Sequence, residues 1–99
     1  DDSEEHKVKE IQINSKSRLS LQSHSKRSEV WVVIKGEAIV TVDENISTLK
    51  VNDSIYIPTG SKHRLENKLN DPLHIIEIQT GSYFGENDIQ RYEDDYSRA

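Results

Sequence analysis

Residues 58–67 read PTGSKHRLEN, and this stretch decides how the rest of the chain is interpreted. Pro58 and Gly60 are typical of a tight turn, and the residues from Lys62 onward have the pattern of a short strand. His63 therefore stands where a turn leads into a strand. A lone histidine is more often a surface or hydrogen-bonded residue than a ligand, so its meaning depends on what distant parts of the chain bring to it.

Period-two alternation of apolar and polar residues extends over most of the chain before Ser82. Residues 30–34, VWVVI, form a continuous apolar run, typical of a strand covered on both faces. Turn residues at 43–45 and 70–72 separate further short segments. About eight strands with turns at this spacing predict an antiparallel sandwich or small barrel.

Three regions are expected along the chain. Residues 1–6 are predicted to be a disordered acidic terminus, residues 7–80 the barrel, and residues 81–99 a tail that packs on it. The tail is predicted to be irregular or to hold one helical turn near residues 87–92.

Composition narrows the classes of function. The net charge of −5 over 99 residues argues against a nucleic-acid partner, which requires a basic face. The chain has no cysteine, no signal peptide and no apolar run near the roughly 18 residues that span a membrane. A cytoplasmic protein is therefore expected. The hydrophobic fraction of 32% implies a thin core, which favours a homodimer.

Four side chains are candidate metal ligands. Gln22 and His24 stand two residues apart on one strand, so they share a face, and Glu29 begins the next strand. If the sheet closes into a barrel, these three and His63 can converge on one interior point. Two imidazoles, a carboxylate and an amide oxygen suit a borderline divalent ion.

The spacing of these residues resembles the two motifs of the cupin superfamily. The first, G-x5-H-x-H-x(3,4)-E-x6-G, is matched by Lys16, Gln22, His24, Glu29 and Gly36. The second, G-x5-P-x-G-x2-H-x3-N, is matched by Asn52, Pro58, Gly60, His63 and Asn67. The resemblance implies an all-β fold with a single cupin domain, a double-stranded β-helix or jelly-roll-like small barrel.

Three positions depart from these motifs. Lys16 and Asn52 replace turn glycines, and Gln22 replaces the first metal histidine. Asparagine visits left-handed backbone conformations, so Asn52 can keep the turn, whereas Lys16 implies a different local turn.

A closer resemblance is to the carboxy-terminal cupin domain of type II mannose-6-phosphate isomerases, usually fused to a mannose-1-phosphate guanylyltransferase. That family also has glutamine at position 22, and its tail is similar to GSYFGENDIQRYEDDYSR at residues 81–98. Its histidine-rich HHHRAEHW differs from HSKRSEVW at residues 24–31, which puts substrate handling in doubt more than metal binding. Guanylyl transfer is not expected, because 99 residues leave no room for that second domain.

The resemblance implies interconversion of mannose 6-phosphate and fructose 6-phosphate, with this sugar phosphate as the partner. Gln22, His24, Glu29 and His63 would hold one divalent metal ion, with zinc favoured over cobalt, manganese, nickel or iron. The candidates for the phosphate contact are Lys26, Arg27 and Arg91, and those for the catalytic base are Glu77, Glu86 and Asp88.

Two other hypotheses stay open. One is a non-catalytic cupin module that binds a metal or a sugar. The other is a different metal-cupin enzyme, such as an oxygenase with iron in the same ligands.

Overall fold

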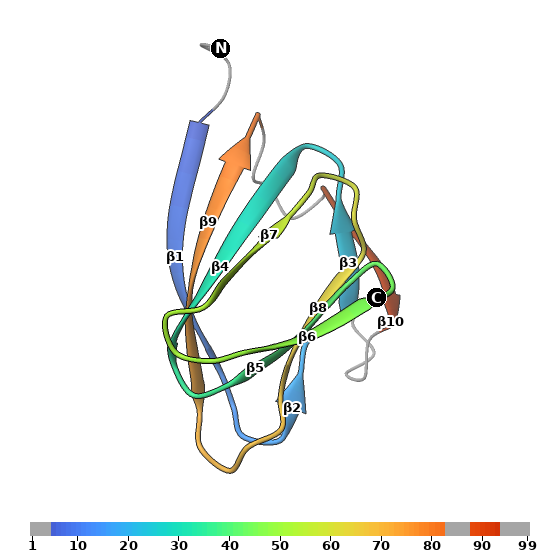
Figure 1. The fold of residues 1–99 in the computed structure, drawn as a ribbon. Coiled ribbons are helices and arrows are strands. Elements are labelled where there is room, and N and C mark those ends of the chain that lie inside the picture. The colour runs from blue at the N-terminus through green and yellow to red at the C-terminus, as the bar shows by residue number, and fades with distance from the viewer. Residues whose placement is uncertain (1–4, 83–87, 94–99) are drawn as a thin grey trace.

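The computed structural model describes residues 5–82 and 88–93, and its secondary structure elements are ten β-strands (Figure 1). They are β1 Glu5–Ile13, β2 Ser17–Arg18, β3 Leu21–His24, β4 Arg27–Lys35, β5 Ala38–Val42, β6 Asn45–Leu49, β7 Ser54–Ile57, β8 His63–Asn67, β9 Leu73–Gly81 and β10 Ile89–Glu93. Within these ranges no helix is long and apolar enough to cross a membrane.

The strands form two antiparallel sheets. One has the order β1-β9-β4-β7, and the other has the order β10-β3-β8-β5-β6, with β2 also paired to β8. The two sheets lie on opposite sides of the barrel in Figure 1. The predicted all-β, cupin-like barrel is confirmed.

The core lies between the two sheets. Along β4 the alternation places Trp31 and Val33 in the interior, while Val30 and Val32 on the outer face are half-buried. The expectation that residues 30–34 are covered on both faces therefore holds only in part. The buried apolar residues are Ile13, Trp31, Val33, Ala38, Val40, Leu49, Ile57, Leu65, Leu73 and Ile75.

Four motif positions have a left-handed backbone. The φ angles are +96° at Gly36, +86° at Gly60 and +76° at Asn52, and Lys16 also has a positive φ, +56°. The expectation of a different turn at Lys16 is wrong, because the lysine adopts the conformation that glycine would. A non-glycine residue there costs about 1–2 kcal/mol, and the hydrogen bond from Lys16 N to Leu69 O (3.1 Å) helps to offset that cost.

Both ends of the barrel domain differ from expectation. β1 begins at Glu5, opposite Gly81, so Glu5 and His6, which were predicted to belong to a disordered terminus, are part of a barrel strand. The helical turn predicted near residues 87–92 is wrong for residues 89–92, which belong to strand β10, antiparallel to β3, while Asp88 has 3-10 conformation. The Tyr92 hydroxyl lies 3.0 Å from Ser23 Oγ, and Lys62 Nζ lies 4.4 Å from the centre of the Tyr92 ring. These contacts and the pairing with β3 hold residues 89–92 against the barrel.

Asn67, the last residue of the second motif, connects two loops at one end of the barrel. Its side chain is 1% exposed, and Nδ2 donates to the carbonyl oxygens of Ile13, Asn14 and Asp71 at 2.8–3.2 Å. Its Oδ1 accepts from Leu69 N at 3.0 Å. Asn67 therefore serves the fold and takes no part in the cluster around His63.

We predict that Asn67→Asp destabilises the protein by about 3 kcal/mol or more, because a carboxylate would face three carbonyl oxygens without a donor. Urea unfolding measures the change. Asn70→Asp, at an exposed position in the same loop region, is the matched control and should shift stability by no more than about 0.5 kcal/mol. Equal unfolding midpoints for the two variants would contradict the prediction.

Candidate metal centre

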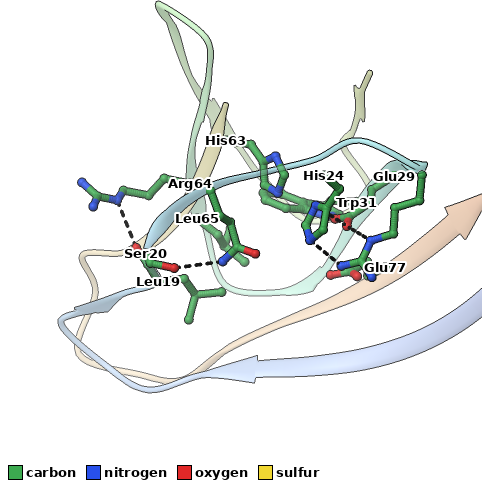
Figure 2. A pocket seen from close by; sticks show the side chains of 11 residues that line it. Leu19, Ser20, His24, Glu29, Trp31, His63, Arg64, Leu65 and Glu77 are labelled. Carbon is green, nitrogen blue, oxygen red and sulfur yellow. Dashed lines mark hydrogen bonds and ion pairs between the residues drawn. The ribbon is translucent and has the colours of Figure 1, made fainter. Parts of the chain in front are cut away.

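Three buried side chains meet at one point inside the barrel. His24 ends β3, Glu29 lies in β4 and His63 begins β8, and one ligand atom from each lies within 4.8 Å of the other two. Figure 2 shows them gathered on one side of a cavity. Of the four predicted ligands, the structure brings these three together directly.

The turn at residues 58–60 places His63 beside His24. Gly60 N donates a hydrogen bond to His24 O at 2.7 Å, which ties the turn to the end of β3. The two imidazole rings then stack with their centres 5.2 Å apart. His63 Nδ1 lies 3.1 Å from Ser61 O, so Nδ1 carries the proton and the Nε2 lone pair is available to a ligand.

Gln22, the fourth predicted ligand, lies beside this cluster. It pairs with His63 across β3 and β8 and lines the same cavity. Its Nε2 donates to Ser20 Oγ at 3.0 Å. The amide oxygen is the atom that an ion would use.

Glu29 is held by two donors. Trp31 Nε1 donates to Oε1 at 2.8 Å, and Arg27 Nε donates to Oε2 at 2.9 Å. The Trp31 ring also meets the His63 ring edge-on, with the centres 5.6 Å apart. Trp31 thus belongs to the core, as predicted, and at the same time fixes the carboxylate and one imidazole.

Both histidines are neutral at physiological pH. Burial, followed by the charges of Arg27 and His63, lowers the pKa of His24 to about 4. Burial also lowers the pKa of His63, although its hydrogen bond to Ser61 acts in the opposite direction. Neutral imidazoles are the form that binds metal ions.

Glu77 faces this cluster from β9 and lines the cavity. Burial, followed by the negative charge of Glu29, raises the pKa of the Glu77 carboxyl. Gln79 Nε2 donates a hydrogen bond to Glu77 Oε2. A buried carboxyl with a raised pKa is a stronger base than an exposed one, which suits a group that takes up and returns a proton.

Arg27, a predicted phosphate ligand, lies inside the cluster instead. Its side chain is 7% exposed, and Nη2 lies 2.7 Å from His24 Nε2. The backbone at Arg27 packs so closely on Gly81 that a Cβ at Gly81 would overlap Lys26 O and lie 2.7 Å from Arg27 Cα. The start of β4 is thereby fixed against the end of β9.

Lys26 and Asp88 lie outside the cavity. The Lys26 side chain is exposed, and Asp88 accepts hydrogen bonds from Ser25 N, Ser25 Oγ and Lys26 N at 2.7–3.1 Å. Partial burial acts to raise the Asp88 pKa, but these bonds hold it below the ordinary value. The position of Asp88 thus supports a structural role in the turn after β3, not the predicted role of base.

The remaining predicted residues are Arg91 and Glu86. Arg91 lies opposite Gln22 in β10, and its charge adds to the lowering of the His24 pKa. Glu86 lies outside the described residues.

Two exposed lysines near the cavity, Lys7 and Lys9, were not predicted as site residues. They share the interior face of β1 with Ile11 and Ile13, and Lys9 stands opposite Glu77, whose pKa its charge acts to lower. The period-two pattern that ends in Ile11 and Ile13 was the signal that could have identified them.

The cavity fits a small ion better than a sugar. Its volume is about 50 Å³, enough for an ion with a few waters. Two neutral imidazoles and a carboxylate form a donor set that suits zinc or a similar borderline ion. His24 Nδ1 is also buried without a hydrogen-bond partner and lies 3.5 Å from Glu29 Oε2, so both polar atoms of this ring face the cluster.

Solved structures with the same fold include two of low sequence identity. A cupin 2 domain-containing protein from Halorhodospira halophila matches with a TM-score of 0.77 and 22% identity, over 91% of this chain and 60% of that one. A double-stranded β-helix domain protein from Klebsiella pneumoniae matches with a TM-score of 0.77 and 19% identity, over 90% and 76%. These likenesses establish the cupin fold.

Several curated proteins share much more sequence identity with this chain than these two structures do. The alginate biosynthesis protein AlgA of Pseudomonas fluorescens is 52% identical over 93% of this chain, and the mannose-1-phosphate guanylyltransferase ManC of Salmonella typhimurium is 45% identical over all of it. The chain spans about a fifth of the length of these curated relatives, 19% and 21%. The family model described as mannose-6-phosphate isomerase C-terminal matches residues 1–94, and the chain belongs to this family.

Proposed function

We propose that this domain interconverts mannose 6-phosphate and fructose 6-phosphate with a divalent ion held by His24, Glu29 and His63. The observation that carries the proposal is the convergence of these three ligands and the buried acid Glu77 on one cavity, in a chain of this family. The cluster lies between strands of both sheets, so each side chain is held by the barrel itself.

The chemical task is to move a proton between C1 and C2 of the sugar. When bound, a divalent ion would supply positive charge to the oxygen that becomes negative as the proton leaves. Gln22 is the further group that can turn an oxygen toward such an ion. The Ser61 and Trp31 contacts keep His63 and Glu29 in place, so little rearrangement of these two ligands is required.

Glu77 is the residue that we assign to the proton transfer. It comes from the sheet of Glu29, lines the cavity and has a pKa that burial and the charge of Glu29 raise. Gln79 Nε2 orients one of its oxygens. A carboxylate in this position can accept the proton from one carbon and return it to the next.

The phosphate end needs a cation outside the cavity, because the cavity is too small for a whole hexose phosphate. Lys7 and Lys9 lie on the interior face of β1, opposite Gln79 and Glu77. Their register places two positive charges next to the assigned base. Lys7, Lys9 and Lys26 are all exposed, and we place the phosphate contact at Lys7 and Lys9 because their register puts them beside Glu77.

The test of the function is a coupled assay for fructose 6-phosphate formation from mannose 6-phosphate. We expect turnover with added zinc or cobalt and none after chelation. His63→Ala should lose bound metal and at least about 100-fold in activity, because it removes a ligand. His74→Ala, on the half-buried outer face of β9, is the matched control and should retain both. Full activity in His63→Ala would contradict the proposal.

Glu77→Gln separates proton transfer from metal binding. The substitution keeps the shape of the side chain but removes the base, so kcat should fall by about 10²–10⁴-fold while zinc binding persists. Zinc stoichiometry and steady-state kinetics measure the two effects. The exposed Glu44→Gln, with the same chemical change in a hairpin, should leave both unchanged. A Glu77→Gln protein with wild-type kcat would remove Glu77 from the mechanism.

The double variant Lys7→Gln and Lys9→Gln tests the phosphate contact. Exposed ion pairs are individually weak, so we expect the KM for mannose 6-phosphate to rise roughly threefold to tenfold, with little change in zinc affinity. Lys35→Gln with Lys50→Gln is the control of equal charge at two other exposed positions. An equal rise of KM in both double variants would mean that only net charge matters.

A second candidate is a module that binds a metal ion without turnover. The observation that favours it is the size of the cavity, which holds an ion and leaves no space for a hexose phosphate. Stoichiometric metal with no fructose 6-phosphate formed under any of the metals would select this second function.

A further inference from the structure

The Arg27 guanidinium contacts two of the side chains that a metal ion would bind, so the two cations would compete for them. Its Nε donates to Glu29 Oε2 at 2.9 Å, and its Nη2 lies 2.7 Å from His24 Nε2. The guanidinium thus bridges two of the three candidate ligands. With only 7% of its surface exposed, it is an internal positive charge in the cavity and no surface group.

The contact with His24 excludes a metal at that imidazole. A guanidinium can only donate, so Arg27 Nη2 uses the single lone pair of the neutral ring at Nε2, and the ring proton must then lie on Nδ1. A metal at Nε2 would need the lone pair that Arg27 occupies. A metal at Nδ1 would move the proton to Nε2, where it would face the Arg27 donor. Whichever nitrogen binds, the Arg27–His24 hydrogen bond must break.

We propose that Arg27 is a displaceable internal cation that holds the metal-free site together and is expelled from His24 when a metal ion binds. The proposal rests on the metal centre proposed above. In the metal-free state Arg27 supplies the positive charge that buried Glu29 requires. In the loaded state the ion supplies that charge.

The cavity offers the released guanidinium another partner. Glu77 lines the same cavity and interacts electrostatically with both Glu29 and Arg27. A guanidinium turned from His24 toward Glu77 would remain buried and paired. Its fork of N–H donors would then lie beside the assigned base, where an anionic substrate group could also accept from it. Metal binding and the charge next to Glu77 would thus be linked.

Zinc affinity of the 99-residue chain provides the first test. Arg27→Met removes the competing donors while keeping an unbranched side chain as far as the position of Nε, so zinc should bind at least about tenfold more tightly, the effect of losing one charged hydrogen bond. The metal-free variant should melt at a lower temperature than wild type, and its rise in Tm on adding zinc should be larger. Lys26→Met is the matched control, because it makes the same change at the adjacent exposed residue. We expect it to bind zinc as wild type does.

Weaker or unchanged zinc affinity in Arg27→Met would overturn the proposal, since Arg27 would then support the ligands and not compete for them. Arg27→Lys keeps the charge but cannot bridge both partners with a planar fork. Its zinc affinity is the second test if the Met variant does not fold. It too should bind zinc more tightly than wild type.

Loss of charge repulsion alone would also tighten zinc binding, so a measurement on the wild-type protein decides the mechanism. The Arg27 Nε–H resonance, assigned by its absence in Arg27→Lys, should be protected from exchange without metal and should shift with one equivalent of zinc, because the guanidinium changes its partner. A resonance that is unchanged on loading would overturn the proposal.

The outcomes also separate this inference from the proposed function. Zinc that binds while Arg27 stays in place would overturn the displacement and leave the isomerase proposal intact. Zinc binding by Arg27→Met but not by wild type would support the competition and count against a working metal centre in this chain. Failure of both proteins to bind zinc or cobalt would overturn both proposals.

Discussion

The burial of one negative charge, that of Glu29, is the constraint on which the site depends. A carboxylate with 3% of its surface exposed is tolerated only when donors or a cation lie against it. Trp31 and Arg27 provide these from the same strand, at 2.8 and 2.9 Å, because residues 27, 29 and 31 share a face. A buried ion pair is poor evidence for stability, since desolvation costs several kcal/mol per ion. A buried pair of Arg27 and Glu29 in so small a core is therefore better explained by a cation-binding site than by a gain in stability.

The position of the ligands follows from turns far from one another in the sequence. A change of one residue in register would turn every side chain of a strand to the opposite face. The left-handed residues Gly60 and Asn52 lie at turns next to β8 and β7, and the Gly60 N–H is bonded to His24 O. The turn that introduces His63 is therefore part of the same unit as His24. This is the structural reason for the spacing between proline, glycine and histidine at residues 58–63.

Much of the fold and of the candidate ligand cluster could be predicted, because strand parity is a local rule and the motif spacings imply the barrel closure that parity cannot show. Parity alone placed Gln22 with His24 and Glu29 with Trp31. Parity could not predict the contacts of Asp88, which accepts hydrogen bonds from backbone N–H groups in the turn after β3. These contacts join residues more than 60 apart in the sequence, and no local pattern encodes them. Parity also failed for Lys16, whose conformation is imposed by its neighbours against its own preference. Lys7 and Lys9 were overlooked because charges on an edge strand usually face solvent.

Strand geometry also bears on how a six-carbon substrate would meet so small a cavity. From Glu77 to Gln79 along β9, and from Lys9 to Lys7 opposite them, the backbone advances about 7 Å, two strand residues. An open hexose chain has five carbon–carbon bonds and spans roughly 6 Å. With its reacting carbons at Glu77, the sugar would carry its phosphate toward Lys7, near the end of β1 at Glu5. The cavity then needs to admit only the carbons that exchange the proton, and its small volume is compatible with the proposed isomerisation.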